Sequence, residues 1–166
     1  YPDDPHDRMW FPWVNSSSWT EISTTRRVKY EADSPFEAPM AVMQTAIRPR
    51  NATHNIEFDW EPQPQANDPS PGYIIIMHFS ELQLLPSNAV REFYINLNGK
   101  LLNRDVMRPP YLYGQASYNT FAIRKSYYIV SLNATANSTL PPIINALELF
   151  SGIPTTNLST NSQDGM

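Results

Sequence analysis

The most constraining part of the chain is the stretch from residue 72 to residue 99, GYIIIMHFSELQLLPSNAVREFYINLNG. Residues 73–79 form its most apolar run, and five of these seven residues are β-branched or aromatic, which favours a pleated strand. Because the run is apolar at both odd and even positions, we expect a central strand that is covered on both faces.

The second half of this stretch alternates between apolar and polar residues. Phe93, Ile95 and Leu97 occupy one parity, so they predict a strand with a single buried face. Asn98 and Gly99 follow, and both residue types tolerate positive φ. This pair is the signature of a type I′ hairpin, so we expect the chain to turn here and return.

Shorter apolar patterns predict the remaining strands. We expect them within residues 22–32, 41–47, 54–60, 116–123, 127–134 and 140–150. The side chains predicted to share inward faces are Ile56, Phe58 and Trp60, then Tyr128, Val130 and Leu132, with Val28 and Tyr30 together in the first segment. Sixteen prolines argue against long helices. The sequence therefore predicts an all-β sandwich of about eight to ten strands.

Length and charge restrict the class of protein. A chain of 166 residues suits one domain. The formal charge is −4 without a basic cluster, which argues against nucleic acid as a partner. No apolar run approaches the roughly 20 residues that span a bilayer, so we expect no membrane insertion by this chain. It opens without a methionine, and we interpret it as a piece of a longer protein, with residues 151–166 as a polar linker.

Five Asn-x-Ser/Thr sequons suggest an extracellular protein. They begin at Asn15, Asn51, Asn133, Asn137 and Asn157. All five fall in predicted loops or strand ends, where an N-linked glycan would be solvated. Accidental matches in an asparagine-rich chain are the alternative interpretation. If residues 127–134 pleat regularly, Asn133 lies on the outer face, opposite in parity to Tyr128.

No pattern predicts catalysis, a metal site or a cofactor. A nucleophile elbow and a glycine-rich phosphate loop are absent from the sequence. The 16 acidic residues neither select nor exclude a glycosidase pair. His78 lies within the central strand and is interpreted as a core imidazole. The acids of residues 3–7 could suggest a calcium site, but pairing with Arg8 and turn hydrogen bonds account for them.

Aromatic residues are the remaining functional signal. Trp10, Phe11, Trp13 and Trp19 cluster near the start, and Tyr111, Tyr113 and Tyr118 cluster near the sequence PPYLY. Exposed rings can stack on sugars or anchor a peptide, whereas buried rings would only cover the ends of the core. Tyr111, Tyr113, Tyr118 and Trp13 are the candidate ligand-binding residues.

Several stretches together resemble a known family. They are YPDDPHDRMWFPW, HFSELQLLP, REFYINLNG, PPYLY and SLNATANSTLPPIINALELF. In this order they resemble the malectin-like extracellular domain of plant receptor-like kinases that also carry leucine-rich repeats. The resemblance covers the chain to about residue 150. It implies that residues 1–150 are the second of two tandem modules, beginning with the inter-module connection, and that residues 151–166 lead toward the repeats.

The resemblance also carries expectations about fold and function. It implies an antiparallel jelly-roll-like sandwich of the malectin or galactose-binding-like type. It implies a place on the extracellular side of the plasma membrane, as part of a single-pass glycoprotein with a cytoplasmic serine/threonine kinase. The expected role is binding of a carbohydrate, cell-wall or peptide signal. The alternative is a scaffold that packs against the tandem module or a co-receptor without binding a ligand.

Overall fold

The structure is a computed structural model, and it describes residue 4 and residues 6–13, 17–31, 34–51, 55–63 and 72–152. Within these residues the chain forms nine strands and one short helix. The elements are β1 (Trp19–Ser23), α1 (Met40–Met43), β2 (Thr45–Pro49), β3 (Ile56–Trp60), β4 (Tyr73–Phe79), β5 (Phe93–Leu97), β6 (Lys100–Leu101), β7 (Gln115–Tyr118), β8 (Tyr128–Ala134) and β9 (Ala146–Ser151). The predicted all-β class is confirmed.

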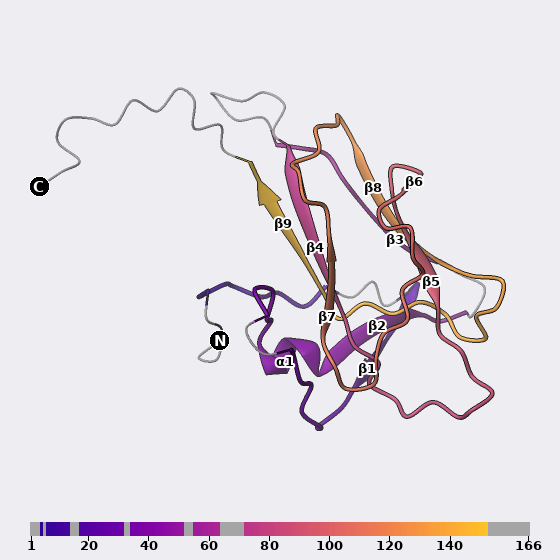
Figure 1. Cartoon of the computed structure of the whole chain (residues 1–166). Coiled ribbons are helices and arrows are strands. Elements are labelled where there is room, and N and C mark those ends of the chain that lie inside the picture. The colour runs from indigo at the N-terminus through magenta and orange to yellow at the C-terminus, as the bar shows by residue number, and fades with distance from the viewer. Residues whose placement is uncertain are drawn as a thin grey trace, which may run out of the picture.

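Two antiparallel sheets face each other across the core (Figure 1). One has the strand order β3-β8-β5-β6, the other β7-β4-β9, and a separate pair is formed by β1 and β2. β4 is central, as predicted, and its residues Ile75, Met77 and Phe79 are fully buried. α1 lies near β1 and β2 at one end of the sandwich in Figure 1.

The main core confirms the alternation that the sequence predicts. From the four-stranded sheet, buried side chains come from alternate positions: Ile56, Phe58, Phe93, Ile95, Leu97, Tyr128, Val130 and Leu132. Trp60 is only partly buried and packs against this cluster. At the predicted hairpin, Asn98 has φ 50° and Gly99 has φ 75°, the two positive values that a type I′ turn requires.

A second, smaller core lies outside the main one. It contains Val28, Ala38, Met43, Ala46 and Leu82, with Trp10, Ile22, Tyr30 and Leu112 packed against it. Gly114 is needed here because a Cβ at this position would clash with the Tyr30 ring. The Tyr30 hydroxyl in turn accepts a hydrogen bond of 3.2 Å from the Ala38 N–H, so the residue joins two loops of this core.

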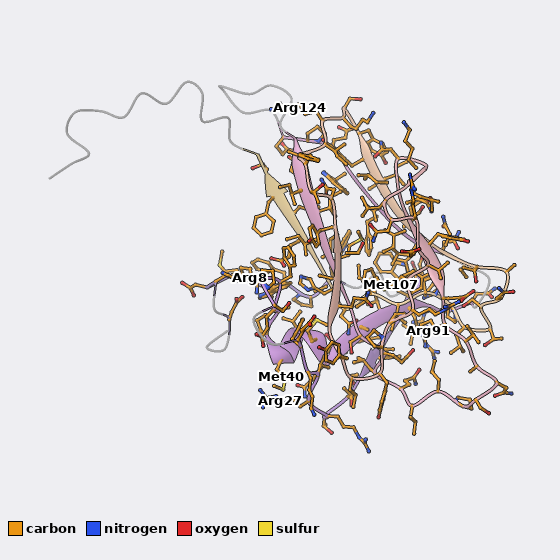
Figure 2. The ribbon with its side chains drawn as sticks, in the orientation of Figure 1. Arg8, Arg27, Met40, Arg91, Met107 and Arg124 are labelled. Carbon is orange, nitrogen blue, oxygen red and sulfur yellow. The ribbon has the colours of Figure 1, made fainter. Side chains whose placement is uncertain are left out.

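A buried ion pair joins the end of β4 to the start of β5. Arg91 Nε lies 2.6 Å from Glu81 Oε2, and both side chains are almost completely buried. Arg91 also donates to the carbonyl of Pro141. Figure 2 shows Arg91 well away from Arg8, which lies beside β9. The pair therefore fixes loops at a distance from the site described below.

The strand predicted for residues 41–47 is wrong for residues 41–43, whereas residues 45–47 do belong to a strand, β2. The chain instead forms α1, in which the Gln44 N–H donates to the Met40 carbonyl at 2.9 Å, and then β2. Short apolar runs do not distinguish a strand from a buried helical turn. Here Pro39 stands at the helix start, where proline is tolerated, and the Met43 side chain is buried in the smaller core.

Three other strand bounds also differ from those predicted. The strand predicted within residues 22–32 is β1, which starts at Trp19 and ends at Ser23. Farther along this predicted segment, Lys29 forms an isolated bridge with Tyr113. The strand predicted for residues 116–123 ends at Tyr118. Beyond this point the Ile75 N–H of β4 donates to the side-chain oxygen of Asn119 at 2.7 Å, so the backbone ladder stops.

The last strand was predicted within residues 140–150, starting after Pro141 and Pro142, and it begins only at Ala146. Ile144, which follows the prolines, pairs instead with Ile47 of β2 through two backbone hydrogen bonds. The last strand ends at Ser151, one residue inside the expected linker. Asn15, His54, Asn157, most of the predicted loop at residues 61–71 and the rest of the tail lie outside the described residues.

Candidate functional site

An apolar groove of about 600 Å³ opens beside β9, and we call it the β9 groove. Its lining residues are Met9, Trp10, Phe11, Pro12, Trp13, Glu21, Ala41, Val42, Thr45, Ala46, Ile47, Phe58, Ile144, Asn145, Ala146, Leu147 and Leu149. β3 and β9 each lie at one end of their sheet order. Phe58 of β3 and Leu149 of β9 both line the groove, so it follows the open side of the sandwich.

Residues 9–13 form one wall of the groove and leave their rings accessible. Phe11 is 79% exposed and Trp13 is 54% exposed. The Trp13 ring nevertheless packs on Phe58, with ring centroids 4.8 Å apart, and meets Trp19 edge-on at 6.0 Å. Trp13 is therefore held in place while part of its ring faces solvent, as an anchoring residue requires.

Asn145 and Thr45, two of the polar residues that line the groove, are already engaged within the fold. The Asn145 amide accepts from the Ser80 N–H at 2.7 Å and donates to the carbonyls of Met43 and Thr45 at 3.1 and 2.9 Å. The Thr45 hydroxyl donates to the Val42 carbonyl at 3.0 Å. Glu21 is the charged residue among the described lining residues. The groove thus offers apolar contact more than hydrogen bonding.

Arg8 fastens the groove wall to the three-stranded sheet. Its Nη1 donates to both carboxylate oxygens of Glu148 on β9 at 3.0 Å. Its Nε and Nη2 donate to Asp4 at 3.0 to 3.1 Å, and its guanidinium stacks 5.0 Å from the Trp10 ring. Trp10 Nε1 donates to Asp4 at 2.8 Å. Figure 2 shows Arg8 beside the three-stranded sheet, close to α1.

His78 extends this arrangement into the centre of the sheet. Its Nε2 lies 2.7 Å from Glu148 Oε1, and the ring is completely buried. The Trp10 ring meets it edge-on at 6.1 Å, while Nδ1 has no hydrogen-bond partner among the described residues. The interpretation of His78 as a core imidazole is confirmed. We call Asp4, Arg8, Trp10, His78 and Glu148 the Arg8 network.

Asp4, Arg8 and Glu148 of the Arg8 network are charged at neutral pH. Burial alone would raise the pKa of Asp4, but hydrogen bonds from Arg8, Trp10 and the His6 N–H hold it far below its usual range. Burial would likewise raise the pKa of Glu148, but the hydrogen bond with His78 and the charge of Arg8 lower it. The pKa of Arg8 is raised despite burial, because Asp4 and Glu148 favour its charged form.

The sequence predicts only half of this network. The expected pairing of the early acids with Arg8 is confirmed for Asp4, whereas the second partner, Glu148, was missed. Glu148 lies 140 positions from Arg8, and no local pattern connects them. The available signal is that Glu148 is the single charge in the apolar strand ALELFS, where a buried acid needs a partner.

The predicted binding tyrosines do not join Trp13. Tyr111, Tyr113 and Tyr118 are each 38 to 39% exposed, and none lines the β9 groove. The Tyr111 hydroxyl accepts from Arg26 Nη1 at 3.3 Å, and Leu112, which lies between Tyr111 and Tyr113 in the sequence, packs against the smaller core. Tyr118 packs instead on Phe36, with ring centroids 4.4 Å apart.

The described sequon asparagines lie away from the core. Asn133 lies on the outer face of β8, because the alternate residues Tyr128, Val130 and Leu132 of this strand are the buried ones. Asn51 and Asn137 are exposed, and the Asn137 side chain hydrogen-bonds to Glu92. The predicted outward orientation of Asn133 is therefore confirmed.

The described residues contain no cluster of three His, Asp or Glu side chains placed to hold a metal ion. In the same part of the chain, no helix combines the length and apolarity needed to cross a bilayer.

The fold and the groove define an antiparallel β-sandwich module with an apolar groove on its surface. The model of the malectin-like domain matches residues 1–152, and the chain belongs to that family. The matched family is that of a malectin-like domain and not of a kinase catalytic domain, although relatives that contain the matched region are named as receptor-like kinases.

Similar proteins in Arabidopsis thaliana are receptor kinases. The receptor-like protein kinase At3g21340 is 31% identical over 175 residues, covering 99% of this chain and 18% of that protein. The "Probable LRR receptor-like serine/threonine-protein kinase PAM74" is 33% identical over 166 residues, again covering 99% and 18%. This chain thus spans less than a fifth of the curated relatives it matches.

Solved plant ectodomains share the fold. The ANX2 ectodomain from Arabidopsis thaliana matches with a TM-score of 0.66 and 17% identity, covering 87% of this chain and 43% of that one. A chain in the crystal structure of the plant peptide RALF23 in complex with FER and LLG2 matches with a TM-score of 0.58 and 16% identity, covering 84% and 42%. These matches agree with the predicted malectin-type sandwich.

Proposed function

We propose that this chain is the extracellular ligand-binding module of a plant membrane receptor-like serine/threonine kinase, and that its β9 groove binds a peptide or an extended protein segment. The observation that carries the proposal is Trp13, which is fixed on Phe58 at 4.8 Å yet remains 54% exposed at the groove. A half-exposed ring beside an apolar groove is typical of a protein-binding surface.

The chemistry of the groove favours a peptide over a carbohydrate. A sugar presents hydroxyl groups, which need free polar partners in its site. Asn145 and Thr45 already use their polar atoms within the fold. The solved complex of RALF23 with FER and LLG2 reports a peptide with a protein of this fold, which supports a peptide ligand and a co-receptor as partners here.

A carbohydrate or cell-wall ligand is the second candidate, at the loop of Tyr111 and Tyr113. Both rings are exposed, and the Tyr111 hydroxyl contacts the Arg26 guanidinium, so the loop offers stacking together with hydrogen bonding, as sugar sites require. The third candidate is the scaffold role, in which the β9 groove packs against a tandem module or co-receptor without a ligand. Under each of these the module lies outside the cell, attached to the membrane by another part of the parent protein.

The arrangement within the parent protein is part of the proposal. Residues 1–150 form the second module of a tandem, with the inter-module connection at its start, and residues 151–166 lead toward leucine-rich repeats. The relatives named as LRR kinases support this order. Asn15, Asn51, Asn133, Asn137 and Asn157 carry N-linked glycans, because an extracellular module passes through the secretory pathway.

The test is a comparison of ligand classes on the secreted module. The folded module is applied to an array of plant cell-wall oligosaccharides and is used to select binders from a displayed library of random peptides. We expect peptides that bind wild type but not Phe11→Ala, while Leu84→Ala retains them. Phe11 and Leu84 are equally exposed at 79%, so they form a matched pair. Sugar binding that depends on Tyr111 would favour the second candidate. If the module bound neither sugars nor peptides, the scaffold role would be favoured.

A further inference from the structure

One edge of β9 is free of backbone pairing in the described structure. β9 ends the sheet order β7-β4-β9 and pairs only with β4. The Gly152 N–H donates to the Gly72 carbonyl at 2.8 Å, so even-numbered positions face the ladder with β4. The N–H and C=O groups of Leu147, Leu149 and Ser151 therefore point to the open edge. No described backbone group bonds to them there.

This edge lacks most of the features that usually block strand pairing. Exposed edges in natural proteins carry lysine, proline, bulges or inward charges. β9 has no lysine and no proline, and its single inward charge, Glu148, is already bonded to Arg8 and His78. The edge strand β3, in contrast, carries the exposed acids Glu57 and Asp59. β9 is thus the more accessible edge for an added strand.

The open edge and the β9 groove are continuous. Leu147 and Leu149 belong to both features. Their backbone groups point to the open edge, and their side chains line the β9 groove. Because side chains alternate along a strand, every second side chain of an added strand would lie against the apolar surface of Trp13 and Phe58. Backbone pairing with pockets for alternate side chains is the recognition mode called β-augmentation.

The charges around the groove select the partner. Glu21 lines the groove and is exposed, and the described lining residues include no lysine or arginine. Glu57 and Asp59 lie on the adjacent β3 edge, and the whole chain has a formal charge of −4. A positively charged segment is therefore favoured. A second copy is disfavoured, because two-fold pairing of β9 would bring two acidic rims together.

We propose that the open edge of β9 takes up an extended, positively charged apolar peptide segment as an additional strand, with alternate side chains in the β9 groove. This inference rests on the proposed function and specifies the conformation and charge of the peptide that the groove binds. Backbone pairing supplies affinity at Leu147, Leu149 and Ser151, while the acidic rim supplies the preference for basic residues.

The probe is a capped heptapeptide, Lys-Val-Thr-Val-Thr-Val-Lys, which alternates apolar and polar side chains and carries a positive charge at each end. Its partner control has glutamate at both ends. In titrations followed by the backbone amide signals of the module, we expect the largest changes at Leu147, Leu149 and Ser151. The lysine peptide should bind roughly tenfold more tightly than the glutamate peptide, and Glu21→Lys should reduce that difference.

Two N-methylated versions of the lysine peptide test strand pairing itself. One is methylated at the valine amides and the other at the threonine amides. Because alternate N–H groups of a strand point to opposite edges, one version should lose binding and the other should retain it. Equal binding of both versions would overturn the strand inference.

The design separates this inference from the proposed function. If peptides from the selection bind in a Trp13-dependent way but show no amide changes on β9, the strand inference fails and the proposed function stands. Failure of the lysine heptapeptide to bind at millimolar concentration, while selected peptides bind, has the same meaning. If no peptide of either kind binds the folded module, the proposed function itself fails.

Discussion

Arg8 and Glu148 meet across 140 positions of sequence, with Arg8 Nη1 donating to both carboxylate oxygens at 3.0 Å. This contact joins the N-terminal segment to β9, the strand that carries the open edge. The wall of the β9 groove follows directly after Arg8 in the chain, so the ion pair sets the position of Trp13 as well as contributing to stability. The first two predictions concern this pair.

Arg8→Ala should destabilise the module by about 3 kcal/mol, because it leaves the buried carboxylates of Asp4 and Glu148 without their partner. Urea unfolding followed by fluorescence measures the free energy. Arg26→Ala removes an exposed arginine whose contact with Tyr111 is 3.3 Å, and it should change the free energy by less than about 0.5 kcal/mol. Equal effects of the two substitutions would contradict the role given to Arg8.

Acid should destabilise the module through the same carboxylates. The folded-state pKa values of Asp4 and Glu148 are lowered from their ordinary values of 3.8 and 4.5. Their contribution to stability is therefore complete above those ordinary values and is lost as the pH falls through the lowered folded-state pKa values. Glu92, whose pKa is lowered by Thr135 and Arg108, acts in the same direction.

The measurement is the free energy of unfolding in urea between pH 7 and pH 3. We expect it to fall below about pH 5, and Glu148→Gln should make the dependence shallower. A stability that rises on acidification, or a slope unchanged by Glu148→Gln, would show that the Arg8 network does not hold its carboxylates in the charged form.

The smaller core can be tested through a pair of glycines. Gly114→Ala places a methyl group against the Tyr30 ring and should cost about 1 to 3 kcal/mol. Gly152→Ala meets Ala122 only at 3.4 Å, an ordinary contact, and should be nearly neutral. Thermal unfolding of both variants provides the comparison. If Gly114→Ala were as stable as Gly152→Ala, the packing of Tyr30 under this loop would be wrong.

Alternation of side chains allowed much of the sandwich to be predicted. Strands with one buried face, such as β5 and β8, show it directly, and β4 is recognised because it is apolar on both faces. Residues 41–43 failed because a helical turn and a strand can bury the same short apolar run. The end of β7 depends on the Asn119 side chain and the start of β9 on the pairing of Ile144 with Ile47, and neither contact has a pattern in the local sequence.

The site was less predictable than the fold. Trp13 was a candidate from its residue type, but its exposure depends on how Phe58 and Trp19 pack beneath it. Neither the Arg8 to Glu148 contact nor the open edge of β9 has a local signature, because both are set by which distant strands become neighbours. The four candidate binding residues lie in three separate places, with only Tyr111 and Tyr113 together, because a shared residue type says nothing about distance in the fold.

Glycosylation should follow the exposure of the described sequons. In a secreted product from a eukaryotic host, Asn51 and Asn133 are expected to carry glycans, because their side chains lie outside the core. Glycopeptide mass spectrometry measures occupancy at each site. Asn51→Gln and Asn133→Gln should remove the corresponding glycans. Unmodified asparagine at both positions in a folded, secreted module would argue against an extracellular role.

The central claim is that ligands bind in the β9 groove through Trp13. Isothermal titration calorimetry of a selected peptide against wild type, Trp13→Ala, Tyr111→Ala and Leu84→Ala tests it most directly, once thermal unfolding shows that each variant is folded. The account predicts at least a roughly tenfold loss of affinity for Trp13→Ala alone. Unchanged affinity of Trp13→Ala, together with loss in Tyr111→Ala, would contradict it and place the site at the tyrosine loop.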